Sequence, residues 1–99
     1  MKHDSENKRL ALLFTSKLQS SLGNDWAKVA SGEAHPNDLC DANFLMIEAF
    51  SDVFGREPYF PSDVEEGYAT EAQMDADADT LDGIWATAFA LWGVKEGAE

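Results

Sequence analysis

Positive charge is scarce in this 99-residue chain, which holds seven Lys and Arg residues against 19 Asp and Glu residues, a net charge of −12. The deficit is uneven: residues 1–28 carry five bases and three acids, whereas residues 29–99 carry two bases and 16 acids. Binding to nucleic acid requires basic side chains that displace counterions from phosphates, and binding to an anionic membrane surface needs the same charges. We therefore expect neither nucleic acid nor a membrane as a direct partner.

Cysteine and long apolar runs are also scarce. Cys40 is the single cysteine, so the chain can form no internal disulfide, which suits a reducing compartment. The N-terminal sequence MKHDSENKRL is charged and contains no apolar run of signal-peptide length. The longest apolar block covers 11 residues, Ile84 to Val94, whereas a membrane-spanning helix needs about 20. The expectation is a soluble, cytoplasmic protein.

Recognisable catalytic and cofactor-binding patterns are missing. The glycines are scattered and form no phosphate-binding loop. His3 and His35 make no spaced ligand pair with Cys40, which we interpret as a packing residue. Acidic pairs such as Glu65 and Glu66 lie within a dense acidic field and have no flanking cleft signature. We therefore expect no enzymatic activity and no cofactor.

Strand-like alternation of polar and β-branched residues is absent, and helical patterns separated by Gly and Pro take its place. The apolar fraction of 44% is sufficient for one core, and the length suits one domain. The sequence thus predicts a single all-α domain over residues 1–99, a compact bundle of three to four helices with an irregular acidic connection before the last helix. The expected helices cover approximately residues 5–22, 25–31, 38–54 and 76–92.

The core is predicted from apolar residues at helical spacing. Segment 38–54 is apolar on more than one side, which indicates a central helix. Its Asn43 falls in the apolar seam, where we expect it to bond a neighbouring helix end. In the last helix, Gly83, Thr87 and Ala90 form a strip that permits close approach of another helix. The expected stripes are Ala11, Phe14, Leu18 and Leu22; Cys40, Ile47, Phe50 and Phe54; and Leu81, Ile84, Trp85, Ala88, Leu91 and Trp92.

Three aspartates near the start of the last helix raise the question of a calcium site. Asp75, Asp77 and Asp79 match positions 1, 3 and 5 of a calcium-binding loop, but the required Gly and Glu at positions 6 and 12 are Thr80 and Ala86. Residues two apart also point to different sides of a helix. Acids in a first turn interact favourably with the helix dipole, and any of the three can act as the cap. We therefore expect a helix start here and no metal site.

Two stretches, HPNDLCDANFLMIEAFSDVFGRE (His35 to Glu57) and DADTLDGIWATAFALW, carry a resemblance to a known family. The chain resembles small uncharacterised acidic proteins encoded by bacteriophages and prophages, which share a D-A-N-hydrophobic helix, a G-R-E turn and an acidic segment leading into a Trp-containing last helix. The resemblance implies a setting in the bacterial cytoplasm during infection, and a role in binding host proteins, as anti-CRISPR proteins and nucleic-acid mimics do. It carries over no functional residue. The basic N-terminal quarter departs from a mimic that covers the whole surface.

The main hypothesis is a non-enzymatic protein whose acidic face binds and inhibits a host protein by blocking a basic, nucleic-acid-binding surface. It rests on nine acids without a base between residues 57 and 82. An alternative is a small structural or assembly module that forms a helical homodimer through Trp26, Phe44, Leu45 or Trp92. A solvated face that only maintains solubility is the simplest reading of the charge. The expected partner-binding residues are Asp63, Glu65, Glu66, Glu71, Asp75, Asp77, Asp79 and Asp82.

Overall fold

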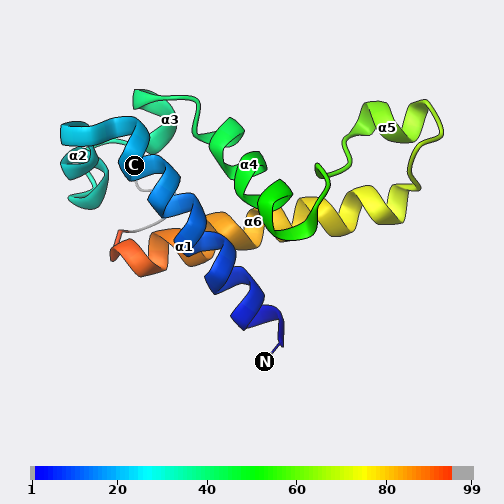
Figure 1. Ribbon diagram of the computed structural model, residues 1–99, viewed down its shortest axis with the longest axis horizontal. Helices are drawn as coiled ribbons and strands as arrows, with labels where there is room; N and C mark the ends of the chain where they lie inside the picture. The colour runs from blue at the N-terminus through cyan, green and yellow to red at the C-terminus, as the bar shows by residue number, and fades with distance from the viewer. Residues whose placement is uncertain (1, 95–99) are drawn as a thin grey trace.

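A computed structural model describes the backbone of residues 2–94 and the side chains of residues 6–94, so the side chain of His3 lies outside the described residues. The described chain is helical and has no strand, which confirms the all-α prediction (Figure 1). None of its helices is long and apolar enough to cross a membrane. The elements are α1 (Lys2–Leu22), the 3-10 helix η1 (Gly23–Asp25), α2 (Trp26–Ala30), α3 (Pro36–Leu39), α4 (Ala42–Phe54), α5 (Pro61–Glu65) and α6 (Glu71–Trp92).

The core lies where α1 packs against both α4 and α6 (Figure 1). Phe14 of α1 is fully buried, and its ring meets Trp85 of α6 edge-on at a centroid distance of 5.1 Å. A second link joins the same helices, because the Trp92 Nε1–H donates a hydrogen bond of 2.8 Å to Thr15 Oγ1. The core residues of the three helices are Leu10, Ala11, Phe14 and Leu18; Ala42, Met46 and Ala49; and Ile84 and Ala88.

Of the apolar stripe predicted for α1, Ala11, Phe14 and Leu18 are buried and Leu22 is half-buried. The stripe predicted for α6 needs one correction. Leu91 is 43% exposed, and Phe89 is buried instead. The reason is a tertiary contact: the His35 ring packs against Trp85 and Phe89, at centroid distances of 5.2 and 5.6 Å, and so covers that side of α6.

The central helix begins later than the sequence predicts. Cys40 has an extended backbone, with φ −159° and ψ 177°, which separates α3 from α4. Asp41 then caps α4, its Oδ1 accepting the Phe44 N–H at 3.2 Å. A single helix over residues 38–54 is therefore wrong.

This break changes which face of α4 is buried. The predicted stripe of Cys40, Ile47, Phe50 and Phe54 is confirmed only in part: Phe50 is buried and Cys40 packs against the core, whereas Ile47 is half-buried and Phe54 is 38% exposed. Asn43 is exposed, not in the apolar seam. Counting from the true first residue, the i, i+4, i+7 and i+8 positions point inward. These are Ala42, Met46, Ala49 and Phe50.

The close approach predicted at Gly83 occurs, and the neighbour belongs to the same chain. A Cβ atom added to Gly83 would lie 2.8 Å from Nδ2 of Asn7 on α1. The absence of a side chain at this position therefore leaves room for the Asn7 side chain between α1 and α6, which compensates for the poor helix propensity of Gly.

The last helix begins at Glu71, so the expected start near residue 76 is wrong. Thr70 is the cap: its Oγ1 accepts the Gln73 N–H at 3.1 Å, and Gln73 Oε1 accepts the Thr70 N–H at 2.8 Å. Asp75, Asp77 and Asp79 thus lie inside the helix, and none of them caps it. The connection before α6 is less irregular than expected, because it contains α5.

Candidate acidic interaction surface

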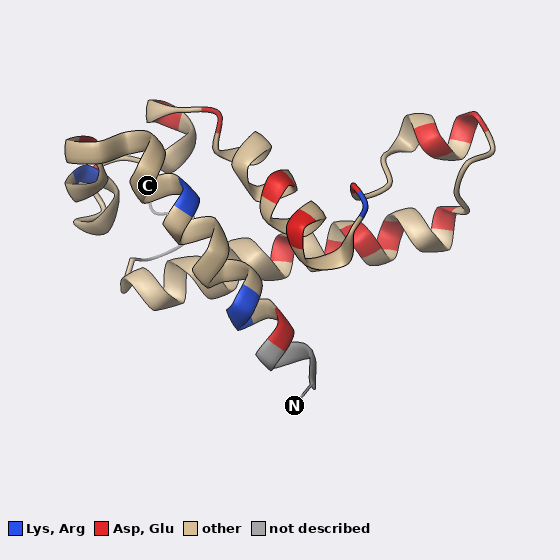
Figure 2. Ribbon diagram, in the orientation of Figure 1, with Lys and Arg blue, Asp and Glu red and all other residues tan. Residues whose placement is uncertain are grey.

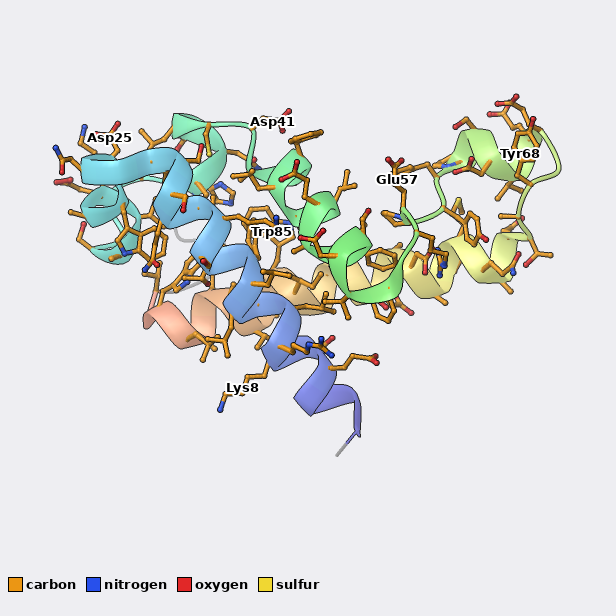
Figure 3. All side chains as sticks on the ribbon, in the orientation of Figure 1. Lys8, Asp25, Asp41, Glu57, Tyr68 and Trp85 are labelled. Carbon is orange, nitrogen blue, oxygen red and sulfur yellow. The ribbon has the colours of Figure 1, made fainter. Side chains whose placement is uncertain are left out.

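The acidic arm, residues 57–82, consists of α5 and the first half of α6, which contact each other at one end of the molecule (Figure 1). Figure 2 shows acidic residues on both of these helices and no basic residue on either. The arm carries nine acids. Tyr68, 71% exposed, lies at its tip, and Glu57 lies near its base (Figure 3).

Asp77 is an interior residue of the arm. It is 5% exposed, and Arg56 binds it with two hydrogen bonds, Nη1 to Oδ2 at 2.8 Å and Nη2 to Oδ1 at 3.0 Å. The backbone N–H of Tyr59 donates a third, to Oδ2 at 2.8 Å. This bidentate pair fastens the connection after α4 to the middle of the arm. The expectation that Asp77 faces a partner is therefore corrected.

Aromatic rings complete the surroundings of the pair. The Arg56 guanidinium carbon lies 4.5 Å from the centroid of the Tyr59 ring and 5.3 Å from that of Phe50, a cation–π arrangement that favours the charged form. Hydrogen bonds from Arg56 are the main cause that holds the pKa of Asp77 below its ordinary value, although burial opposes them. Asp77 is thus ionised at neutral pH, and Arg56 balances its charge.

The other seven predicted residues have accessible side chains: Asp63 is half-buried and the rest are exposed. Asp63 also has a local role, since its Oδ2 accepts the Phe60 N–H at 2.8 Å and closes the first turn of α5. Among residues 6–94, the ion pairs use none of these seven carboxylates. They are Asp63, Glu65, Glu66, Glu71, Asp75, Asp79 and Asp82.

Three of these acids form one stripe, which we call the acidic ridge. Asp75, Asp79 and Asp82 are spaced i, i+4 and i+7 on α6, so they share a face, and all three are exposed. The ridge rises about 6 Å between Asp75 and Asp79. Asp77 points to the opposite, buried side, so Asp75, Asp77 and Asp79 do not converge. No group of three or more His, Cys, Asp or Glu in the described residues is placed to hold a metal ion.

Acids on the body of the molecule are, by contrast, partly neutralised. Lys17 on α1 reaches Asp52 at 3.0 Å and Glu48 at 3.7 Å on α4, and its hydrogen bond to Asp52 is the main cause of its raised pKa. Lys28 lies 3.7 Å from Asp25. Most of the accessible acids of residues 6–94 that form no ion pair therefore lie on the arm, although Glu33, Asp38 and Asp41 on the body form none either.

His35 and Cys40 both make contacts that stabilise the fold. His35 caps α3, its Nδ1 accepting the Asn37 N–H at 3.0 Å. The Cys40 thiol donates to the Pro36 carbonyl at 3.6 Å and packs against the core. Burial raises the pKa of Cys40, which lowers the fraction of nucleophilic thiolate.

The apolar residues expected to form a homodimer contact are mostly committed to the fold. Trp26, Leu45 and Trp92 pack against the core, whereas Phe44 is 55% exposed. Single exposed apolar side chains are normal on a protein surface.

Sequence reasoning missed the role of Arg56, although a signal was present. Arg56 is the only base between residues 29 and 94. A lone cation in so acidic a segment is the natural partner for any carboxylate that becomes buried, because a buried charge must be paired.

Comparisons of the chain with protein-family models, with curated proteins and with solved structures find no match.

Proposed function

We propose that this is a non-enzymatic interaction protein whose acidic arm binds a basic surface on a partner protein. The observation that supports it is the accessible acidic surface, which no base interrupts along 26 consecutive residues from 57 to 82. The arm is also anchored: Arg56, in the connection after α4, neutralises the one buried carboxylate of the arm, Asp77, in the middle of the arm. A fixed charged surface loses less entropy on binding than a mobile tail does.

The proposed effect on the partner is competition. Basic protein surfaces commonly bind the phosphates of nucleic acid, and a dense set of carboxylates complements the same surface. The arm then excludes nucleic acid from it, and long-range attraction accelerates association at low salt. From the resemblance to small phage proteins we infer that the partner belongs to a phage-infected bacterium, where an inhibitor of this kind would act against host defence, as an anti-CRISPR protein does.

Affinity capture with a matched pair of variants tests this function. The arm variant is Asp75→Lys/Asp79→Lys, and the control is Asp25→Lys/Glu33→Lys, which makes the same change in charge at exposed residues outside the arm. Each protein is immobilised, and nuclease-treated bacterial lysate is passed over it at low and then moderate salt. We expect the wild type and the control to retain one nucleic-acid-binding protein that salt releases.

The arm variant is expected to bind that protein about 10- to 100-fold more weakly, because two attractive contacts become repulsive. Equal retention on all three columns would show that the arm is not the binding surface. If the wild type retains no protein, the proposed function is rejected, and the acidic face is better interpreted as a solvated surface that only maintains solubility.

A further inference from the structure

An open groove lies between α4 and α6, and half of its lining residues belong to the acidic arm. It has a volume of about 360 Å³. On α6 the groove is lined by Leu81 and Trp85, which are both half-buried. Phe60, which is 37% exposed, also lines it. No Lys or Arg lines it. The lining residues are Asn43, Met46, Ile47, Phe60, Ala78, Leu81, Asp82 and Trp85.

The acidic ridge borders this groove on the solvent side. Asp82 belongs to both, because it lines the groove and ends the ridge. On a helix, Asp75 and Asp79 lie next to the strip that carries Ala78 and Asp82, at i+3 and i+4 spacing. An apolar floor thus lies directly beside a row of carboxylates.

Two other hollows lack this combination. The one between α1 and α4 holds Lys17, which Glu48 and Asp52 already neutralise. The one formed by residues 56–63 is lined by the loop that Arg56 and Asp63 organise. Only the α4–α6 groove of these three joins apolar walls to accessible charge of one sign.

We propose that the α4–α6 groove docks the apolar face of a basic amphipathic helix of the partner protein. This inference rests on the proposed function and names the partner's recognition element. Apolar side chains at i, i+3 or i+4 and i+7 of such a helix enter the groove against Ile47, Leu81 and Trp85. Lys and Arg on its flank meet the carboxylates of the ridge, and Asn43 offers an amide at the rim.

The occupant's chemistry follows from the groove and its border together. A purely apolar helix would leave the ridge without countercharges, and a basic segment without an apolar face would leave the groove solvated. Desolvated apolar anchors supply most of the affinity at such interfaces, and the charged border directs association.

A pair of peptides tests the proposal. Both contain the same lysines and leucines; in one the leucines share a helical face, and in the other they are scrambled over all faces. We expect the amphipathic peptide to bind the wild-type protein at least about tenfold more tightly, because only it places leucines in the groove. In an NMR titration, the indole N–H of Trp85 should shift, whereas that of Trp26, which packs on Trp92 at 5.3 Å, should not.

Two alanine positions on α6 provide the matched variants. Ala78 lines the groove, and Ala76 is exposed on a different side of the same helix. Ala78→Phe fills the groove and should remove the preference for the amphipathic peptide, whereas Ala76→Phe should keep it. A preference that persists in Ala78→Phe would overturn the groove as the docking site.

The two proposals fail in different ways. Equal binding of both peptides, lost in Asp75→Lys/Asp79→Lys, would reject the groove and leave the acidic arm as the binding surface. If neither peptide binds the wild-type protein, the groove is rejected, and the affinity capture with Asp75→Lys/Asp79→Lys decides separately whether the acidic arm binds a partner.

Discussion

Replacing Arg56 with Ala is expected to lower the free energy of unfolding by about 3 kcal/mol, because it leaves the Asp77 carboxylate buried without its countercharge. Asp77 is 5% exposed and would keep only the Tyr59 N–H as a donor. This loss of stability is at the lower end of the range usual for breaking a buried ion pair, because the Arg56 side chain is 42% exposed and water reaches the site. Urea unfolding at neutral pH measures it.

Substitution of the other member of the pair, Asp77→Asn, should lower the free energy of unfolding by less. In Asp77→Asn the charge disappears, the amide oxygen still accepts the Tyr59 N–H, and Arg56 can turn toward solvent. We expect a loss of about 1–2 kcal/mol. Asp79→Asn, on the exposed ridge, is the control and should change stability by less than about 0.5 kcal/mol. If Arg56→Ala were as harmless as Asp79→Asn, the pair would not anchor the arm.

The same pair gives a pH dependence with a definite sign. Because the pKa of Asp77 is lower in the folded state than in the unfolded state, its contribution is complete above the unfolded value of about 4 and is lost as pH falls through the folded value. In Arg56→Ala the hydrogen bonds from Arg56 are gone, and only the Tyr59 N–H still lowers the pKa of Asp77 against the effect of burial. Asp77 then contributes less of the stability that is lost on acidification, so the difference in stability between the wild type and Arg56→Ala should shrink as pH falls below about 4.

Phe14→Ala is expected to destabilise the fold by about 3–5 kcal/mol, the range for removing a fully buried aromatic ring. Phe14 is 0% exposed, and its ring lies 5.1 Å from Trp85 and 6.2 Å from Trp92. Its loss opens a cavity where α1 meets α6. The transition midpoint in urea should fall accordingly, and in a domain of this size the loss is a large part of the total stability.

Leu12→Ala is the matched control for Phe14→Ala. It lies on the same helix but is 53% exposed, so its truncation should cost less than about 0.5 kcal/mol. Similar losses for the two variants would contradict the packing of α1 described above.

The sequence predicts those parts of the fold in which local pattern and tertiary burial agree. The α1 stripe recurs without a break, and Ala11, Phe14 and Leu18 are indeed buried. In α4 the pattern misleads, because apolar residues lie on several sides and the register depends on where the helix begins. The break at Cys40, which cannot be read from periodicity, fixes that point.

In the acidic arm, too, some features can be predicted from the sequence and others cannot. Its charge is visible in the sequence, but the start of α6 is not, because residues 71–76 extend the helix beyond the core and carry no apolar stripe to reveal it. The burial of Asp77 depends on Arg56, which is 21 residues away. A contact at that separation exists only once the chain folds back, and so spacing alone does not predict it.

The groove between α4 and α6 could not be predicted either, since it requires the true register of α4. With Ala42, Met46 and Ala49 turned inward, Asn43 and Ile47 are left at the edge that faces Ala78 and Trp85. The sequence predicts only attraction between charges, whereas the groove and the acidic ridge together suggest which part of a partner would bind, the basic amphipathic helix proposed above.

If the acidic arm occupies a surface that its partner otherwise uses for nucleic acid, the protein should displace nucleic acid from that partner. The most direct measurement is a displacement titration, in which the captured partner is bound to labelled nucleic acid and the protein is added at increasing concentration. The account predicts that the apparent Kd for nucleic acid rises in proportion to the concentration of added protein, and that Asp75→Lys/Asp79→Lys needs at least about tenfold more protein for the same effect. Nucleic acid that stays bound while the partner is saturated with the protein would contradict it.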